Sequence, residues 1–262
     1  MLIAFLLTAA AGLSTGIGSA IAFFKKTSKR FLSISLGFSA GVMIYVSLIE
    51  IFPKARQSLT PSLGMKNGTL VTIIAFFIGI FLIGLIDKLI PKDTNPHEAH
   101  PDSGGEPTPE ARGKLLRTGV FTALAIAIHN FPEGLAAFVS AMQSPEIAVP
   151  IVVAIALHNI PEGIAVSVPI YYATGSRKKA FMYSFLSGLA EPVGAIIGYM
   201  LLLPLMSDVV FGILFASVAG IMVFISLDEL LPSAREYGEH HLSIYGLVAG
   251  MIVMSLSLWL FV

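Results

Sequence analysis

A histidine and a glutamate recur four residues apart in two copies of one hexapeptide, HNFPEG at 129–134 and HNIPEG at 158–163. Residues four apart project from the same face of a helix, so each copy would present an imidazole beside a carboxylate. Two such faces brought together offer four nitrogen and oxygen ligands, which suit tetrahedral zinc and are acceptable to iron(II), cobalt or manganese. The first candidate ligand set is therefore His129, Glu133, His158 and Glu162.

Two asparagines extend this set toward a second ion. Asn130 and Asn159 lie three residues before their glutamates and reach the same helix faces one step round. Their amide oxygens could ligate a second cation, with Glu133 and Glu162 bridging the two ions. Hard oxygen donors would make this second position less selective for zinc than the first.

A third carboxylate, Glu191, stands in an apolar segment directly before Pro192. Together with Glu133 and Glu162 it would offset most of the charge of two divalent ions. Without metal the three carboxylates would repel one another, and protons would bind in their place. Metal entry would then be linked to proton release.

Both hexapeptides lie inside apolar runs, at 118–142 and 147–172, that are long enough to cross a bilayer. An ionisable group buried in lipid costs several kcal/mol unless it has a partner. In an alternative interpretation each histidine pairs only with a glutamate, and Pro132 and Pro161 merely bend their helices. Two matched copies favour a divalent metal as the partner. Because the chain has no cysteine, that metal must be held by nitrogen and oxygen.

The composition requires these elements to be membrane helices. Of the 262 residues, 55% are hydrophobic and 12% charged, the net charge is zero and the mean hydropathy is +0.84. This is typical of an integral membrane protein in a lipid bilayer and gives no indication of nucleic-acid binding. We predict one membrane domain over 1–262 with eight spans, at about 2–24, 31–53, 69–90, 115–142, 146–172, 179–203, 209–232 and 243–262.

The basic residues predict the orientation. Thirteen of the sixteen Lys and Arg fall in or beside odd-numbered loops, and only Lys54, Arg56 and Lys66 fall in an even-numbered one. The positive-inside rule places the odd loops in the cytoplasm. Both termini would then lie outside a multi-pass protein of the cell (inner) membrane.

Two segments with histidines fall outside the spans. Residues 91–114, rich in Pro, Gly and acids up to Glu110, are expected to form a flexible cytoplasmic loop. His97 and His100 in that loop, and His240 and His241 before the last span, are interpreted as solvated. A weak metal-capturing role in the loop, or an exit role before the last span, stays open.

A second repeat reveals inverted symmetry. Residues 47–56 in span two resemble residues 226–235 in span seven, at an offset of 179. Spans two and seven run in opposite directions, as do spans four and five. We therefore predict an all-α membrane protein in which spans 1–3 and 6–8 are inverted repeats around a central pair, spans 4 and 5, as in many transporters. Glu50, Asp228 and Glu229, near helix ends, are either entrance and exit ligands or interfacial carboxylates held by water.

Glycine pairs four residues apart predict close helix contacts. Gly12/Gly16, Gly37/Gly41, Gly194/Gly198 and Gly246/Gly250 have this spacing. It lets helix backbones approach each other. Packing inside the bundle is the favoured interpretation, and a homodimer contact stays open.

A metalloenzyme and a metal-gated channel are the two alternatives to a transporter. An intramembrane metalloenzyme would need a His-Glu-x-x-His helix or several Glu-x-x-His helices. Neither pattern occurs, so no enzyme is expected. A metal-gated channel stays open, since ligands alone do not distinguish a pore from a carrier.

The duplicated HN(F/I)PEG motifs, the Glu191-Pro192 element and the eight-span layout together resemble the ZIP (Zrt/Irt-like) metal transporter family, in particular its bacterial ZupT-type branch. The resemblance implies an eight-helix bundle that takes zinc and other divalent cations, iron included, into the cytoplasm as cargo rather than as cofactors. It implies a binuclear site with His129, Glu133, His158 and Glu162 at one ion and Asn130, Glu133, Asn159, Glu162 and Glu191 at the other. Glu50 and Glu229 would belong to a further transport site.

Overall fold

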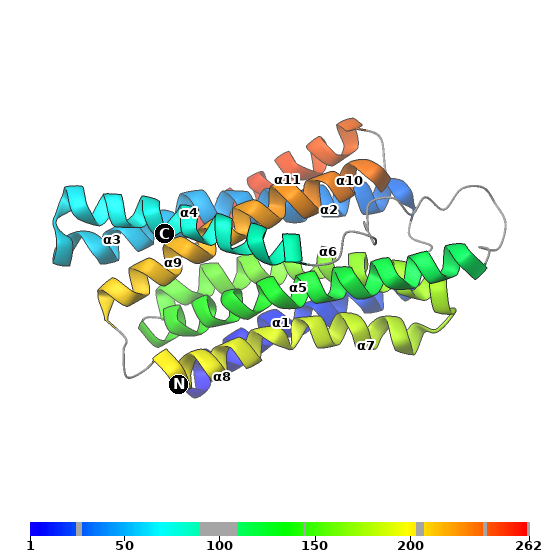
Figure 1. Ribbon diagram of the computed structural model, residues 1–262, viewed down its shortest axis with the longest axis horizontal. Coiled ribbons are helices and arrows are strands. Elements are labelled where there is room, and N and C mark those ends of the chain that lie inside the picture. Colours follow the sequence, from blue (N-terminus) through cyan, green and yellow to red (C-terminus); the bar gives the residue numbers. More distant parts are fainter. Residues whose placement is uncertain (25–27, 90–108, 144, 203–206, 238–239, 261–262) are drawn as a thin grey trace.

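The apolar stretches fold into helices, and no strand occurs in the described part of the chain. The computed structural model describes residues 1–24, 28–89, 109–143, 145–202, 207–237 and 240–260 (Figure 1). The helices are α1 (Leu2–Phe24), α2 (Lys29–Val46), α3 (Phe52–Leu63), α4 (Met65–Leu89), α5 (Pro109–Gln143), α6 (Pro145–Thr174), α7 (Arg177–Gly188), α8 (Ala190–Leu202), α9 (Asp208–Ile225), α10 (Leu231–Tyr237) and α11 (His240–Leu260). Two short π-helical turns, η1 (Ser47–Ile51) and η5 (Ser226–Leu230), complete the set.

Eight helical segments within the described residues are long and apolar enough to cross a membrane, as the sequence predicts. They are Leu2–Ala20, Arg30–Leu63, Met65–Ile86, Thr122–Met142, Ala148–Thr174, Arg177–Met200, Asp208–Arg235 and His241–Leu260. The prediction of an all-α membrane protein with eight spans is confirmed.

Spans two and seven continue beyond the predicted ends. The sequence placed their ends at Pro53 and Pro232, but α3 and α10 carry the helices onward. In each case a π turn ends two residues before the proline. The residue between them donates its N–H to the serine carbonyl that begins the turn, Phe52 to Ser47 and Leu231 to Ser226. A proline is tolerated in the first turn of a new helical segment because its N–H would have no partner there. Glu50 and Glu229 therefore lie within long helices and not near their ends.

Span six is divided at the Glu191-Pro192 element. Helix α7 ends at Gly188, Leu189 forms a turn, and α8 begins at Ala190. The missing N–H of Pro192 leaves the Gly188 carbonyl, four residues earlier, without its helical donor. The predicted loop at 91–114 falls mostly on residues outside the described ranges, while its residues from Pro109 onward already belong to α5.

The helices form two groups, and the inverted repeat maps each group onto itself. Helices α1, α5, α6, α7 and α8 pack together, and α2, α3, α4, α9, α10 and α11 form the second group (Figure 1). The contact between α1 and α6 is equivalent, under the inverted repeat, to the contact between α8 and α5. The contact between α2 and α11 is equivalent in the same way to the contact between α9 and α4. Along the sequence, a residue of span one corresponds to the residue 176 positions later in span six. The offset is 179 positions between spans two and seven, and 29 positions between spans four and five.

Glycines allow the closest of these contacts, inside the bundle as predicted. Gly41 packs against the Leu247 carbonyl of α11, and Gly250 packs in return against the Phe38 carbonyl of α2. Gly12 and Gly188 each pack against the other's carbonyl oxygen, where α1 crosses span six. A side chain at any of these positions would meet backbone.

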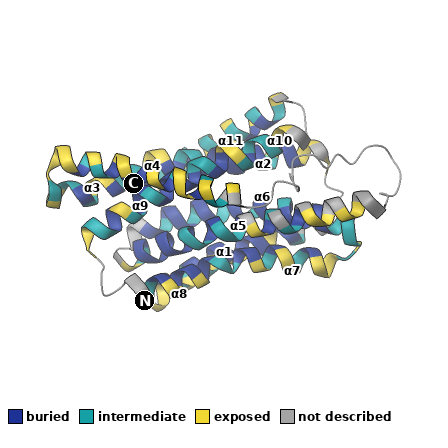
Figure 2. Cartoon of the chain, in the orientation of Figure 1, coloured by how far each residue is buried: buried dark blue, intermediate teal, exposed yellow. Residues whose placement is uncertain are grey.

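The apolar surface faces outward. Buried residues fill the centre of the bundle, while large apolar side chains such as Phe81 on α4 and Trp259 on α11 are exposed (Figure 2). In water this surface would favour aggregation, but in a bilayer it is the surface that lipid contacts.

Candidate metal centre

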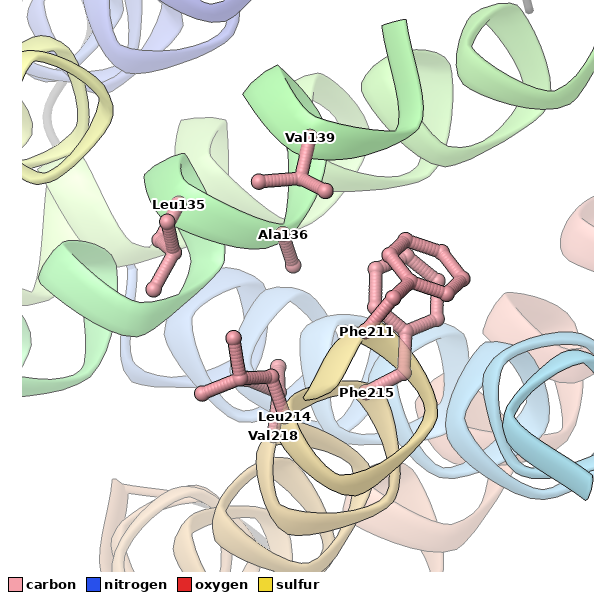
Figure 3. Close-up of a pocket in the computed structure, with 7 residues that line it drawn as sticks. All are labelled: Leu135, Ala136, Val139, Phe211, Leu214, Phe215 and Val218. Atoms are coloured by element: carbon pink, nitrogen blue, oxygen red, sulfur yellow. The ribbon is translucent and has the colours of Figure 1, made fainter. Parts of the chain in front are cut away.

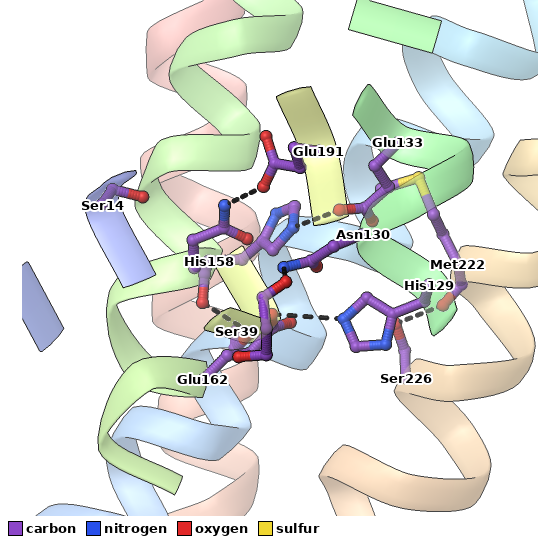
Figure 4. Close-up of polar contacts among 12 residues, drawn as sticks. Ser14, Ser39, His129, Asn130, Glu133, His158, Glu162, Glu191, Met222 and Ser226 are labelled. Atoms are coloured by element: carbon purple, nitrogen blue, oxygen red, sulfur yellow. Dashed lines mark hydrogen bonds and ion pairs between the residues drawn. The ribbon is translucent and has the colours of Figure 1, made fainter. Parts of the chain in front are cut away.

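The seven central residues that the sequence singles out gather in the interior of the bundle, and Figure 4 labels all of them except Asn159. They come from α5, α6 and the start of α8, and each is at most 1% exposed. The seven are His129, Asn130, Glu133, His158, Asn159, Glu162 and Glu191. Burial of so many polar groups without bulk water requires that they satisfy one another or bind something.

The histidines and glutamates pair across helices. His129 Nε2 lies 3.2 Å from Glu162 Oε2, and His158 Nε2 lies 3.2 Å from Glu133 Oε2 (Figure 4). Each pair joins α5 to α6, so the four side chains form two crossed contacts. The two motifs are thus brought face to face, as their spacing predicts.

The asparagines tie the motifs to spans one and six. Asn130 Nδ2 donates to the Ser187 carbonyl at 3.3 Å, and Asn159 Nδ2 donates to the Ala11 carbonyl at 3.0 Å. These two bonds are equivalents under the inverted repeat. Asn159 Nδ2 also donates to Glu191 Oε1, which attaches the third carboxylate to the site.

Several candidate ligand atoms have no hydrogen-bond partner in the described part of the chain. Both histidine Nδ1 atoms are among them, and so are oxygens Glu133 Oε1, Glu162 Oε1, Glu191 Oε2, Asn130 Oδ1 and Asn159 Oδ1. A buried acceptor without a donor costs about 1–3 kcal/mol. Five such oxygens in one buried cluster fit a cation better than they fit a purely structural network.

The side chains are not arranged as a closed coordination shell. No three His, Asp or Glu side chains among the described residues converge on one metal-binding point. The crossed imidazole–carboxylate contacts hold them apart. A cation would have to replace these contacts in order to gather the four side chains around itself.

Ser39 on α2 is a site residue that sequence reasoning missed. Its hydroxyl donates to the His158 carbonyl at 3.3 Å and faces the Glu162 carboxylate (Figure 4). Its equivalent on α9 is Val218, which cannot form such a bond. A serine in an apolar span that also holds Ser33, Ser35 and Ser47 carries no motif, and because its equivalent is a valine the inverted repeat gives no signal for it either.

The candidate residues outside the central seven differ in how close they lie to the cluster. Glu229 on η5 lies within electrostatic range of His129 and thus belongs beside the central cluster. Glu50 on η1 instead forms an ion pair with Lys54. His97 and His100 lie outside the described residues, as does the side chain of His240, and His241 is exposed.

An eight-span bundle around a buried cluster of imidazole, amide and carboxylate groups defines a polytopic membrane protein with the donor set of a metal transporter. A family model described as "ZIP Zinc transporter" matches residues 88–258. The chain therefore belongs to the ZIP family, which is a family of transporters and not of enzymes.

Curated relatives match nearly the whole chain. A protein named zinc transporter ZupT from Streptococcus mutans serotype c is 65% identical over 260 residues, which is 99% of this chain and 97% of the relative. Proteins of the same name from Clostridium perfringens and Oceanobacillus iheyensis are 62% and 61% identical, over 100% and 99% of this chain and 97% and 98% of the relatives. The ZupT-type resemblance expected from the sequence is confirmed.

Proposed function

We propose that this protein takes zinc, and also iron(II), manganese and cobalt, into the cytoplasm through the buried His/Asn/Glu cluster by alternating access. The observation that carries the proposal is the cluster itself, in which seven ligand-type side chains are at most 1% exposed inside an apolar bundle. Its relatives named as zinc transporters make zinc the first cargo to test.

The cluster holds two ions in this proposal. His129, Glu133, His158 and Glu162 form the first position, which suits zinc because two ligands are imidazoles. Asn130, Asn159 and Glu191, with both bridging glutamates, form the second. Three carboxylates balance most of the charge of two divalent cations, and protons take their place when the ions leave.

A difference between two equivalent interfaces supports alternating access. Leu32 of α2 packs against Ile164 and Val168 of α6 in a buried cluster. Their equivalents are Phe211 on α9 with Leu135 and Val139 on α5, and these surround a cavity of about 10 Å³ (Figure 3). Helices α2 and α6 contact each other more extensively than α5 and α9 do, as expected if the two interfaces exchange roles during transport.

The charge distribution sets the direction. With odd-numbered loops in the cytoplasm, both termini lie outside, the α5–α9 cavity lies on the outer side of the cluster, and the packed α2–α6 interface lies on the inner side. Metal would enter through the α5–α9 interface and leave through the α2–α6 interface. The protein would work in the bacterial cell membrane.

The experiment that tests the proposed function is uptake into proteoliposomes that contain the purified protein, with zinc, iron(II), manganese and cobalt in competition and an imposed pH gradient. A transporter accumulates metal with saturable kinetics, and the competing cations reduce zinc uptake. Absence of metal accumulation in vesicles with correctly folded protein would contradict the proposal.

A second experiment separates a carrier from a channel. The chain has no cysteine, so Leu214→Cys beside the cavity and Ser35→Cys at its equivalent on α2 give single-thiol reporters. Each thiol is labelled with a water-soluble maleimide, with and without added zinc. In a carrier, a condition that increases labelling of one thiol decreases labelling of the other. A channel would let both increase together.

A further inference from the structure

Thr15 on α1 is a buried hydroxyl without a hydrogen-bond partner in the described part of the chain. The residue is 0% exposed, and its Oγ1 atom makes no hydrogen bond to any described group. A threonine inside a helix commonly donates to the carbonyl four residues earlier, as Thr8 does to Ala4 at 3.0 Å and Thr72 to Gly68 at 2.8 Å. Thr15 is an exception with a visible cause.

The carbonyl that Thr15 would use is already engaged. The Ala11 oxygen accepts from Asn159 Nδ2 at 3.0 Å and from Ser14 Oγ at 2.6 Å. Within the helix the same oxygen also faces the Thr15 backbone N–H, so the donors around it already exceed its two lone pairs. The metal cluster itself, through Asn159, therefore releases the Thr15 hydroxyl for another partner.

The inverted repeat places Thr15 opposite Glu191. Gly12 and Gly188 pack on each other's carbonyls, Glu191 Cβ lies against Gly12, and Thr15 Cβ and Oγ1 lie against Gly188. Each related pair is separated by 176 positions. The repeat pairs Thr15 with Glu191 and Asn130 with Asn159. By this symmetry, the position of Thr15 relative to Asn130 corresponds to the position of Glu191 relative to Asn159.

The chemistry on the Asn130 side lacks a counterpart to Glu191. The Oδ1 atoms of Asn130 and Asn159 both lack a hydrogen-bond partner among the described residues, but only Asn159 donates its Nδ2 to a carboxylate, that of Glu191. A hydroxyl there is a neutral, hard oxygen donor. Manganese and other cations that favour six oxygen-rich ligands gain more from an added oxygen than zinc, which is satisfied by four ligands.

We propose that Thr15 is a further ligand of the second cation, the neutral equivalent of Glu191, and that it increases the preference of this position for manganese. The inference rests on the proposed two-ion function. It adds span one to the helices that hold metal, and it assigns a task to a buried hydroxyl that has no hydrogen-bond partner among the described residues.

Manganese binding to the purified full-length protein tests this inference, with calorimetry to count equivalents and affinities. Thr15→Val keeps the side-chain shape and removes the hydroxyl, so we expect the affinity of the second equivalent to fall about tenfold, within the range found for supporting residues of metal sites. Zinc affinity at the first equivalent should stay unchanged. Thr15→Ser should restore manganese binding.

Thr8→Val is the matched control, because Thr8 is equally buried on the same helix but satisfied by Ala4. It should leave both equivalents unchanged. Two manganese equivalents of unaltered affinity in Thr15→Val would overturn the inference, and so would equal losses in Thr15→Val and Thr15→Ser. Wild-type protein that binds a single equivalent would overturn the two-ion site, and this inference with it.

Discussion

At the scale of single residues, the cluster combines pairs that the sequence suggested with contacts that it did not specify. Four-residue spacing predicted that each histidine shares a helix face with its own glutamate. The structure brings these two faces together and joins His129 to Glu162 and His158 to Glu133. Spacing within one helix cannot decide which partner on a neighbouring helix is nearer, so the crossed pairing was beyond sequence reasoning.

Crossed pairing predicts which substitutions are energetically coupled. In metal-free protein, a double-mutant cycle on His129→Ala and Glu162→Ala should give a coupling of about 1–3 kcal/mol, because these groups share a buried contact. The cycle on His129→Ala and Glu133→Ala should give a smaller value. Unfolding of the detergent-solubilised variants measures both, and equal couplings would contradict the crossed arrangement.

The two-ion proposal predicts that Asn159→Ala weakens the second cation more than the first. The substitution removes the amide that joins α6 to Glu191 and to the Ala11 carbonyl. Loss of such a group commonly costs 10–100-fold in metal affinity. A metal titration in which Asn159→Ala still binds two equivalents at wild-type affinity would count against separate positions.

At the scale of helices, the sequence predicted the number and type of the elements correctly, because long apolar runs leave few alternatives in a bilayer. It misjudged the ends of spans two and seven, where Pro53 and Pro232 read as helix terminators. The π turns that accommodate these prolines depend on the i+5 bonds to Ser47 and Ser226, which leave no pattern in composition or period.

Glycine contacts between helices give a prediction at this scale. Gly41→Ala would drive a methyl group into the Leu247 backbone of α11 and should lower stability by about 1–3 kcal/mol. Gly113→Ala, on the exposed first part of α5 where nothing lies within 4 Å, should be neutral or slightly stabilising. Thermal unfolding in detergent compares the two, and equal melting temperatures would show that the close approach is not important.

At the scale of the whole molecule, the inverted repeat connects the fold to transport. In the sequence the repeat was visible in the two hexapeptides and at 47–56 with 226–235. In the structure it also relates the two asparagine bonds to each other and the glycine contacts of α2 with α11 to those of α9 with α4, and it accounts for the Gly12–Gly188 crossing. The two halves are not identical. Ser39 contacts the cluster from α2, whereas Val218 occupies the equivalent place on α9, so the two access states would differ in energy.

Uptake should depend on pH in a direction that follows from the ligands. Carboxylates and imidazoles bind metal in their deprotonated forms, so protons compete with the cation as the pH falls. We expect zinc uptake at fixed free zinc to decline from neutral to acid pH, with an increase in the apparent KM. Initial rates in vesicles over this pH range provide the check, and uptake that rises with acidity would contradict proton competition.

The most direct test of the account is zinc uptake into proteoliposomes by wild-type protein and by Glu162→Gln. Glu162 is fully buried, pairs with His129 and would bridge both ions, so its conversion to an amide should reduce the uptake rate at least tenfold without unfolding the protein. Asp208→Asn, at an exposed carboxylate that begins α9, is the control and should transport normally. If Glu162→Gln accumulated zinc at the wild-type rate, the buried cluster would not be the transport site.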